Sequence, residues 1–184
     1  TTRIEALEQE LARSATVREV KRSSAERAVL IGLETGEGLL EAESRLAELA
    51  ELTTSAGAVV AYKTMQQRHE ADPRTLIGRG KMQELVSMAY HEDADLLIFD
   101  RELNPAQARE IEEETKLKII DRTQLILDIF AQNAKGREAQ VQVELAQLQY
   151  QLPRLAGRGE AMSRLGAGIG TRGPGESKLE LDRR

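Results

Sequence analysis

Short apolar runs alternate with amphipathic stretches through the first two thirds of the chain. The apolar runs predict buried strands over residues 28–33, 58–62, 96–99 and 117–120. Apolar side chains at helical spacing predict helices over residues 39–52, 81–91 and 105–115. Strands that are apolar throughout and are separated by helices indicate a parallel sheet covered on both faces. The pattern therefore predicts an α/β fold, a small parallel four-stranded sheet flanked by helices.

Two local signals refine this α/β part. Asn104 and Pro105 are the residue types preferred at the N-cap and first position of a helix, so a helix should begin there. Ile4, Leu7 and Leu11 suggest a short amphipathic helix that could cover one face of the sheet. We assign residues 1–122 to this α/β subdomain.

From Thr123 the pattern becomes that of a long helix, capped by Thr123 and continuing towards Leu155. Gly136 is a weak point, and Pro153 should kink or end the helix. Within it the apolar residues are spaced 4, 3, 4, 3, which is a coiled-coil seam that needs a partner helix: Val141, Leu145, Leu148, Leu152 and Leu155. A further helical pattern opens at Ser177 and stops at Arg184. We expect a helical hairpin over residues 123–184, truncated at its second helix. Self-association of two chains is one way in which the 141–155 seam could find its partner helix.

Composition excludes several classes of protein. The 184 residues are 40% hydrophobic, which suffices for a core, and contain no Cys. Disulfides, Cys-ligated metals and thiol nucleophiles are therefore excluded. No apolar run approaches the roughly 18 residues of a membrane span, and the first residues lack a signal-peptide pattern. We expect a cytoplasmic protein, and Thr1 need not be its native start.

Charge is distributed unevenly along the chain. Residues 151–184 carry seven basic and four acidic side chains, so the net charge of −5 divides into +3 there and −8 in the first 150 residues. Half of the 14 glycines form a flexible tip within residues 156–177: Gly157, Gly159, Gly166, Gly168, Gly170, Gly173 and Gly175. Arginine matches phosphate geometry, and glycine lets a backbone approach closely. Candidates for RNA contact are Arg154, Arg158, Arg164, Arg172 and Lys178. A disordered linker is the alternative.

Two glycine-containing turns are candidates for phosphate binding. The stretch Gly170–Ser177 has Walker A spacing, but Glu176 stands where that loop requires Lys, and no strand precedes it. Gly78, Gly80 and Lys81 open a predicted helix and form a possible anion site, for which a tight turn is the simpler interpretation.

The remaining polar residues predict no catalytic or metal site. Asp100 and Asp121 follow predicted strands, and we interpret both as turn formers. His69 and His91 are isolated in or beside loops.

Taken together, five strings resemble the N-terminal region of the HflX-type GTP-binding proteins. They occur in order over residues 28–184: Thr75–Lys81, Asn104–Gln107, Ile120–Phe130, Glu144–Leu155 and Gly168–Glu180. The resemblance implies an α/β subdomain and a helical hairpin, followed after Arg184 by a GTPase domain. GTP and Mg²⁺ would bind in that domain. The chain lacks the P-loop and should have no cofactor and no GTPase activity of its own.

The same resemblance implies partners. The family associates with the large ribosomal subunit and is implicated in splitting or rescuing stalled ribosomes, so rRNA is the expected partner of the Gly-rich tip. Two alternatives remain. One is a nucleotide- or phosphate-binding module acting through Gly78–Lys81, and the other is a protein-interaction module acting through the 141–155 seam.

Overall fold

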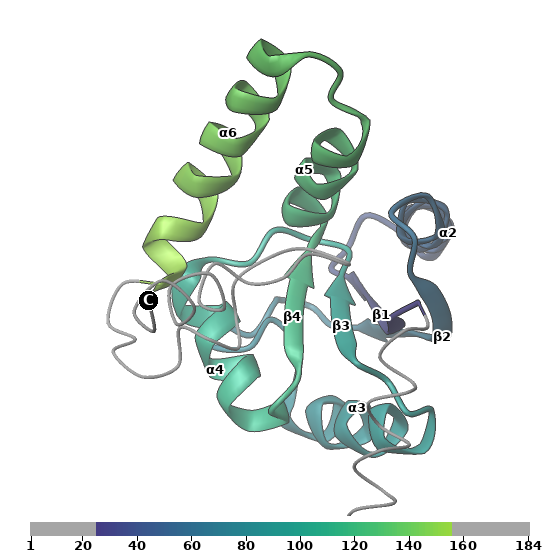
Figure 1. The fold of residues 1–184 in the computed structure, drawn as a ribbon. Coiled ribbons are helices and arrows are strands. Elements are labelled where there is room, and N and C mark those ends of the chain that lie inside the picture. The colour runs from purple at the N-terminus through teal and green to yellow at the C-terminus, as the bar shows by residue number, and fades with distance from the viewer. Residues whose placement is uncertain (1–24, 156–184) are drawn as a thin grey trace, which may run out of the picture.

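Four parallel strands form a single sheet in the computed structural model, which describes residues 25–155 (Figure 1). The strands are β1 (Arg27–Glu34), β2 (Val59–Gln67), β3 (Leu96–Phe99) and β4 (Lys118–Asp121). Their order in the sheet is β2-β1-β3-β4. The helices are α2 (Leu39–Ser55), α3 (Arg79–His91), α4 (Pro105–Thr115), α5 (Arg122–Asn133) and α6 (Arg137–Leu155). The predicted α/β class and the four strands are confirmed.

Both faces of the sheet are buried, which is why its strands read as continuous apolar runs. On one face, Ile31 and Phe99 pack with Leu85 of α3 and Ile111 of α4. On the other face, side chains from β1, β3 and β4 pack with α2 and α5: Leu30, Ile98, Ile120, Leu49 and Leu125. The core lies in two layers and is mainly aliphatic, with Phe99 as its one aromatic residue among those fully buried in the described part of the chain.

The start of α4 is as predicted. Asn104 is its N-cap, and Pro105 is its first residue. The Gln107 N–H donates to the Asn104 side chain at 2.8 Å, and the Asn104 N–H donates back to the Gln107 side chain at 3.1 Å. This reciprocal capping box satisfies two donors that the helix would otherwise leave without partners.

The prediction of one helix from Thr123 to Leu155 is wrong. The chain leaves the helix after Asn133 and resumes it at Arg137, so that α5 and α6 form a hairpin of their own (Figure 1). Gly136 makes this break possible because its φ of +86° suits glycine and strains other residues. The first helix is capped by Asp121, not Thr123: the Gln124 N–H donates to the Asp121 carboxylate at 2.9 Å. Pro153 lies inside α6 and does not end it.

Several predicted segments lie outside the described residues. They are the amphipathic helix near Ile4, the Gly-rich tip over 156–177 and the second arm that opens at Ser177. Among the helices within residues 25–155, none is long and apolar enough to cross a membrane.

Candidate functional site at the carboxyl edge of the sheet

The carboxyl ends of β1 and β3 form the place where a fold of this class usually binds ligands. The connection that follows β1 leads to β2 on one side of it, and the connection that follows β2 leads to β3 on the other side of β1. The connections therefore diverge between β1 and β3. Ligands of open α/β sheets bind in the crevice at such a switch point. Four charged side chains meet there, which we call the switch-point network: Glu37, Arg45, Asp100 and Arg101.

Hydrogen bonds join all four members of the network. Arg45 donates from Nε to Asp100 at 2.8 Å and from Nη2 to Glu37 at 2.7 Å. Arg101 donates to the same Glu37 oxygen at 2.5 Å. Both arginines also donate to the Leu33 carbonyl, at 2.6 and 3.0 Å, and the Leu33 N–H donates to Asp100. Two cations are thus matched by two carboxylates at this edge of the sheet.

The two carboxyl groups of this network differ electrostatically. Asp100 is 2% exposed, and burial raises its pKa against the lowering effect of Arg45. The Thr35 N–H, helped by Arg45 and Arg101, holds the pKa of Glu37 well below its usual range. Asp100 was predicted to be a turn former, and it does lie in the bend after β3. The prediction missed that its side chain is a buried acceptor that ties β1 and α2 to the end of β3. The sequence alone shows only that Asp100 follows a predicted strand.

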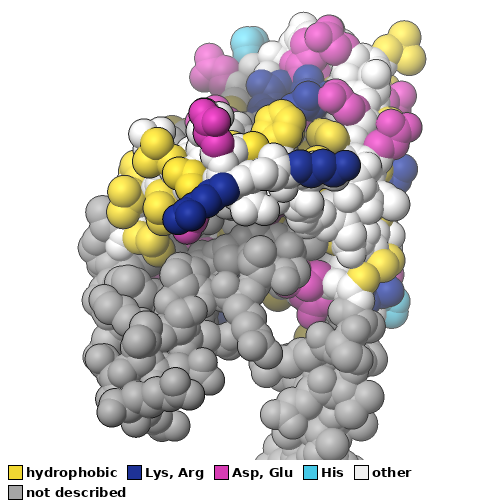
Figure 2. Space-filling view, turned by 45° about the horizontal axis from the view of Figure 1, so that its top comes forward, with side chains coloured by type: hydrophobic (Ala, Val, Ile, Leu, Met, Phe, Trp, Pro, Cys, Tyr) yellow, Lys and Arg dark blue, Asp and Glu magenta, His cyan; other side chains and the backbone are white. Residues whose placement is uncertain are grey.

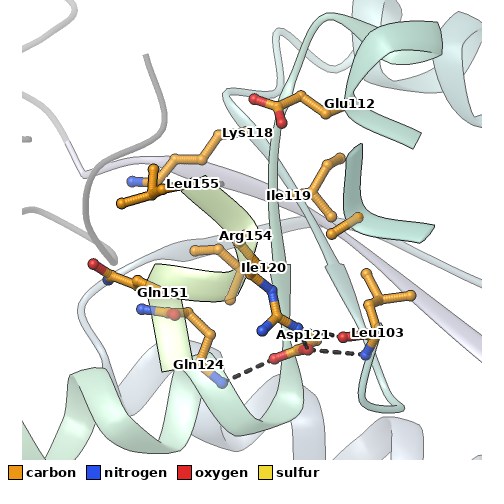
Figure 3. Close-up of a pocket in the computed structure, with 11 residues that line it drawn as sticks. Leu103, Glu112, Lys118, Ile119, Ile120, Asp121, Gln124, Gln151, Arg154 and Leu155 are labelled. Carbon is orange, nitrogen blue, oxygen red and sulfur yellow. Dashed lines mark hydrogen bonds and ion pairs between the residues drawn. The ribbon is translucent and has the colours of Figure 1, made fainter. Parts of the chain in front are cut away.

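A second cluster gathers at the carboxyl end of β4, and we call it the Asp121 clasp (Figure 3). Asp121 is 3% exposed and accepts hydrogen bonds from the Leu103 N–H at 2.9 Å and from Arg154 Nη2 at 2.9 Å. The Tyr150 hydroxyl donates to the same carboxylate oxygen, and Arg154 also donates to the Leu103 carbonyl. Asp121 does cap a helix, as a turn former can, but its larger role is to bind α6.

Tyr150 and Arg154 hold each other within the clasp. The Arg154 guanidinium carbon lies 3.8 Å from the centre of the Tyr150 ring, a cation–π arrangement. Burial and the hydrogen bond to the Asp121 carboxylate raise the pKa of Tyr150 above its usual range, so this hydroxyl remains a donor even in alkaline solution. About two helical turns after Asp121, Asp128 of α5 accepts hydrogen bonds from Gln124 and from Gln147 of α6, both at 3.1 Å.

A cavity of about 50 Å³ lies beside the clasp, between α4, β4 and α6 (Figure 3). Ile120 and Leu155 supply apolar walls, and Gln151 lines it with a polar group. Small-molecule sites usually have several hundred Å³ (about 300–1,000). The cavity is therefore large enough for a few waters and too small for a nucleotide.

Gly78 is the N-cap of α3 and has an extended backbone, while Gly80 and Lys81 lie in the first turn of that helix. The Gly78 N–H donates to the Gln66 side chain at 2.9 Å, and a Cβ on Gly78 would collide with Arg68. Lys81 pairs with Glu84 at 2.8 Å, and its side chain is 12% exposed. The basic group expected at the anion site is thus already paired with a carboxylate.

Of the predicted RNA-contact residues, the structure describes only Arg154. Its side chain is 19% exposed and turns inward to Asp121. The other four, Arg158, Arg164, Arg172 and Lys178, lie outside the described residues, as do the seven tip glycines. Among the described residues, no group of three or more His, Asp or Glu side chains could hold a metal ion.

Four of the five predicted seam residues lie on the outside of α6, which has no buried residue. The fifth, Leu155, is partly buried and lines the cavity. The seam residues Val141, Leu145, Leu148 and Leu152, which we call the α6 stripe, are 46–60% exposed. Hydrophobic side chains gather on the side of the molecule where α6 lies, next to Lys and Arg side chains (Figure 2). None of the described helices packs against this face as the partner that the spacing requires.

Comparison with known proteins gives two adjacent family matches. Residues 43–131 match a family described as GTP-binding GTPase N-terminal, and residues 133–184 match GTP-binding GTPase Middle Region. The GTPase HflX of Alkalihalophilus pseudofirmus is 48% identical over 168 residues, which are 91% of this chain and 40% of that protein. The GTPase HflX of Escherichia coli is 42% identical over 76% of this chain and 33% of its own length.

Solved structures share the fold. A GTP-binding protein from the archaeon Sulfolobus solfataricus, in complex with GDP, superposes with a TM-score of 0.52 at 27% identity, over 71% of this chain and 38% of that one. A complex of SsGBP and GDP gives a TM-score of 0.59 at 23% identity, over 86% of this chain and 40% of that one. The chain thus spans 33–40% of the length of these two HflX relatives. It belongs to the HflX family of GTPases, of which it represents the N-terminal and middle regions.

Proposed function

We propose that this chain is the ribosome-binding and regulatory part of an HflX-type GTPase that associates with the large ribosomal subunit and helps to split or rescue stalled ribosomes. GTP and Mg²⁺ would bind to a GTPase domain that follows in the full-length protein. Binding of GTP there would shift the populations of arrangements in which the present regions meet the ribosome.

One observation carries the proposal beyond family membership. The hairpin of α5 and α6 returns to the sheet, and the clasp fixes its last turn at Arg154. The sequence that follows is the basic part of a chain whose first 150 residues carry a net charge of −8. An acidic body with one basic extension suits a protein that touches RNA phosphates through that extension alone. Arg158, Arg164, Arg172 and Lys178 are the proposed RNA contacts, while Arg154 serves the clasp.

Co-sedimentation with purified large ribosomal subunits tests this function. We expect binding of this chain to weaken steeply with salt, because each phosphate contact releases counterions. Replacing Arg158, Arg164 and Arg172 together by Ala should reduce the slope of log K against log salt by about 2, at roughly 0.7 per phosphate contact.

A matched control removes three exposed cations from the body instead: Lys63, Arg74 and Arg79. This control also removes a charge from the Gly78–Lys81 turn, so unchanged binding would count against that turn as the RNA site. Wild-type affinity and salt slope in the Arg158, Arg164 and Arg172 variant would show that the proposed function is wrong.

The α6 stripe supports a second candidate function, a helix-mediated protein interaction. Association through Val141, Leu145, Leu148 and Leu152 would bury apolar surface and would survive high salt. Sedimentation of this chain at 1 M salt distinguishes the two. Binding to ribosomes should be lost there, whereas association through the stripe should persist.

A further inference from the structure

The helix α6 is attached to the rest of the molecule in an unusual way. It has 19 residues, and none of them is buried. The contacts that fasten it to the body are polar: Tyr150 and Arg154 bind Asp121, Arg154 binds the Leu103 carbonyl, and Gln147 binds Asp128. Its exposed large apolar residues, the α6 stripe, are on the outside, and its apolar residues Val143, Ala146 and Leu155 are only partly buried. Lifting α6 away would therefore expose little core surface.

The other end of α6 has the geometry of a hinge. Only Ala134, Lys135 and Gly136 separate it from α5. Gly136 has a φ of +86°, and a Cβ built there would meet nothing within 4 Å. A short connection with a glycine in open surroundings absorbs changes in backbone angles at little steric cost. Movement of α6 would concentrate at this connection.

The clasp can open without leaving Asp121 unpaired. If Tyr150 and Arg154 withdraw, the Asp121 carboxylate keeps hydrogen bonds from the Leu103 N–H at 2.9 Å and from the Gln124 N–H at 2.9 Å. Tyr150 and Arg154 would then be solvated. A buried carboxylate that retains backbone donors avoids most of the penalty of losing its cation. Closed and open positions of α6 are thus both compatible with an intact α/β body.

We propose that α6 is a hinged arm, and that Tyr150 and Arg154 are positioning residues which hold it closed on Asp121. The arm leads directly into the basic segment after residue 155, so its closed position fixes the direction in which that segment leaves the body. This last role rests on the proposed ribosome-binding function, whereas the hinge and the clasp do not.

Distance measurement between two spin labels tests the arm. The chain has no Cys, so Glu51→Cys on α2 and Gln142→Cys on α6, both exposed, give two unique labels. Electron–electron double resonance should give one narrow distance distribution for the closed arm. The pair Tyr150→Phe and Arg154→Gln, which leaves the Asp121 cap of α5 intact, should broaden the distribution and add longer distances. Arg154→Lys, which keeps the charge, should broaden it less.

The matched control is Arg74→Gln, which breaks an ion pair with Glu110 on the body and should leave the distribution narrow. A narrow, unchanged distribution in the variant that lacks both clasp side chains would overturn the proposal. Circular dichroism of that variant should retain the helical signal, because the arm moves without unfolding. Loss of the α6 signal would mean that the clasp folds the helix, which would also overturn the hinge.

Binding to large ribosomal subunits separates the role of the arm from the function it serves. If the arm positions the basic segment, the Tyr150→Phe and Arg154→Gln variant should bind several-fold more weakly, with an unchanged salt slope. Unchanged affinity in that variant, together with loss of binding in the Arg158, Arg164 and Arg172 variant, would remove the positioning role alone. Unchanged affinity in both the clasp variant and the triple-arginine variant would overturn the proposed function. The distances between the spin labels would still show whether α6 moves about the hinge.

Discussion

The α/β body, on which α5 packs, and helix α6 are built on different physical terms. The body buries apolar side chains on both faces of its sheet, and Leu30, Phe99 and Leu125, the last of these on α5, are all fully buried. In α6 no residue is buried: Gln147, Tyr150 and Arg154 make hydrogen bonds to the body, and the α6 stripe faces outward. Burial of apolar surface gives a rigid and cooperative unit, whereas polar bonds are exchangeable with water. The body is therefore suited to be a base, and α6 to be a part that moves or receives a partner.

Truncating one leucine in each region should reveal this difference most strongly. Leu30→Ala in the body should lower the free energy of unfolding by about 3 kcal/mol, because it leaves a cavity in a core that cannot collapse. Leu148→Ala on the α6 stripe should lower it by less than about 0.5 kcal/mol, since that side chain is 46% exposed. Urea denaturation measures both. Equal losses would mean that the stripe is covered in solution and that the comparison fails.

The same contrast decides what could be predicted from the sequence. Strands such as Leu96–Phe99 are apolar throughout, and the cap of α4 lies within four consecutive residues, so local patterns suffice for both. The clasp joins Asp121 to residues 29 and 33 positions away. It exists only because the chain folds back at Gly136, and no local pattern specifies that. Gly136 was identified as a weak point, but its cost of about 1 kcal/mol does not by itself break a helix.

The switch-point network escaped prediction for a related reason. Arg45 is one of many charged residues on α2, and Glu37 belongs to a glycine-rich turn. Their importance depends on the strand order, which places β3 next to β1 and so brings Asp100 and Arg101 within reach of both. Strand order is a property of the whole sheet. Individual hydrophobic runs predict that strands exist without saying which strands are neighbours.

Breaking the clasp at its centre should give the next largest effect. Asp121→Asn preserves a residue that caps helices well but removes the charge that pairs with Arg154. We expect the free energy of unfolding to fall by about 2 kcal/mol, somewhat less than for the loss of a fully buried pair. Glu110→Gln is the matched control. Its partner Arg74 is 72% exposed, and such pairs contribute about 0–1 kcal/mol.

Amide hydrogen exchange shows which part of the chain loses stability in the Asp121→Asn variant. Protection should fall in α6 and remain in β1 and β3. Uniform loss of protection throughout residues 25–155 would show that the body and the hairpin unfold as one unit.

A smaller effect is expected at the hinge. Gly136→Ala forces a side chain into a φ of +86°, which costs about 1 kcal/mol. The strain should be relieved by a shift of α6, so the hairpin should change and the body should not. Gly57 is also at positive φ, at +92°, but lies between α2 and β2, so Gly57→Ala is the matched control that strains the body. Nuclear magnetic resonance shifts confined to the hairpin in one variant and to the body in the other are the expected result. Shifts at β1 in Gly136→Ala would contradict it.

The last prediction concerns acid and the switch-point network of the body, whose two carboxyl groups respond to pH in opposite directions. The pKa of Glu37 is lowered in the folded chain, so its contribution to stability is present above its ordinary pKa of 4.5 and is lost as pH falls below it. The pKa of Asp100 is raised, so its contribution has the opposite sign: it is present at low pH and is lost as pH rises through the folded pKa. Glu37→Gln removes only the first of these. We expect the variant to be less stable than wild type at pH 7 and to approach it below pH 4.5, when unfolding by urea is followed across this range. Glu43→Gln on the exposed face of α2 should run parallel to wild type. A Glu37→Gln curve that also runs parallel would mean that the switch-point network does not hold its charges in solution, and the body would then lack the acid-sensitive element that distinguishes it from the hairpin.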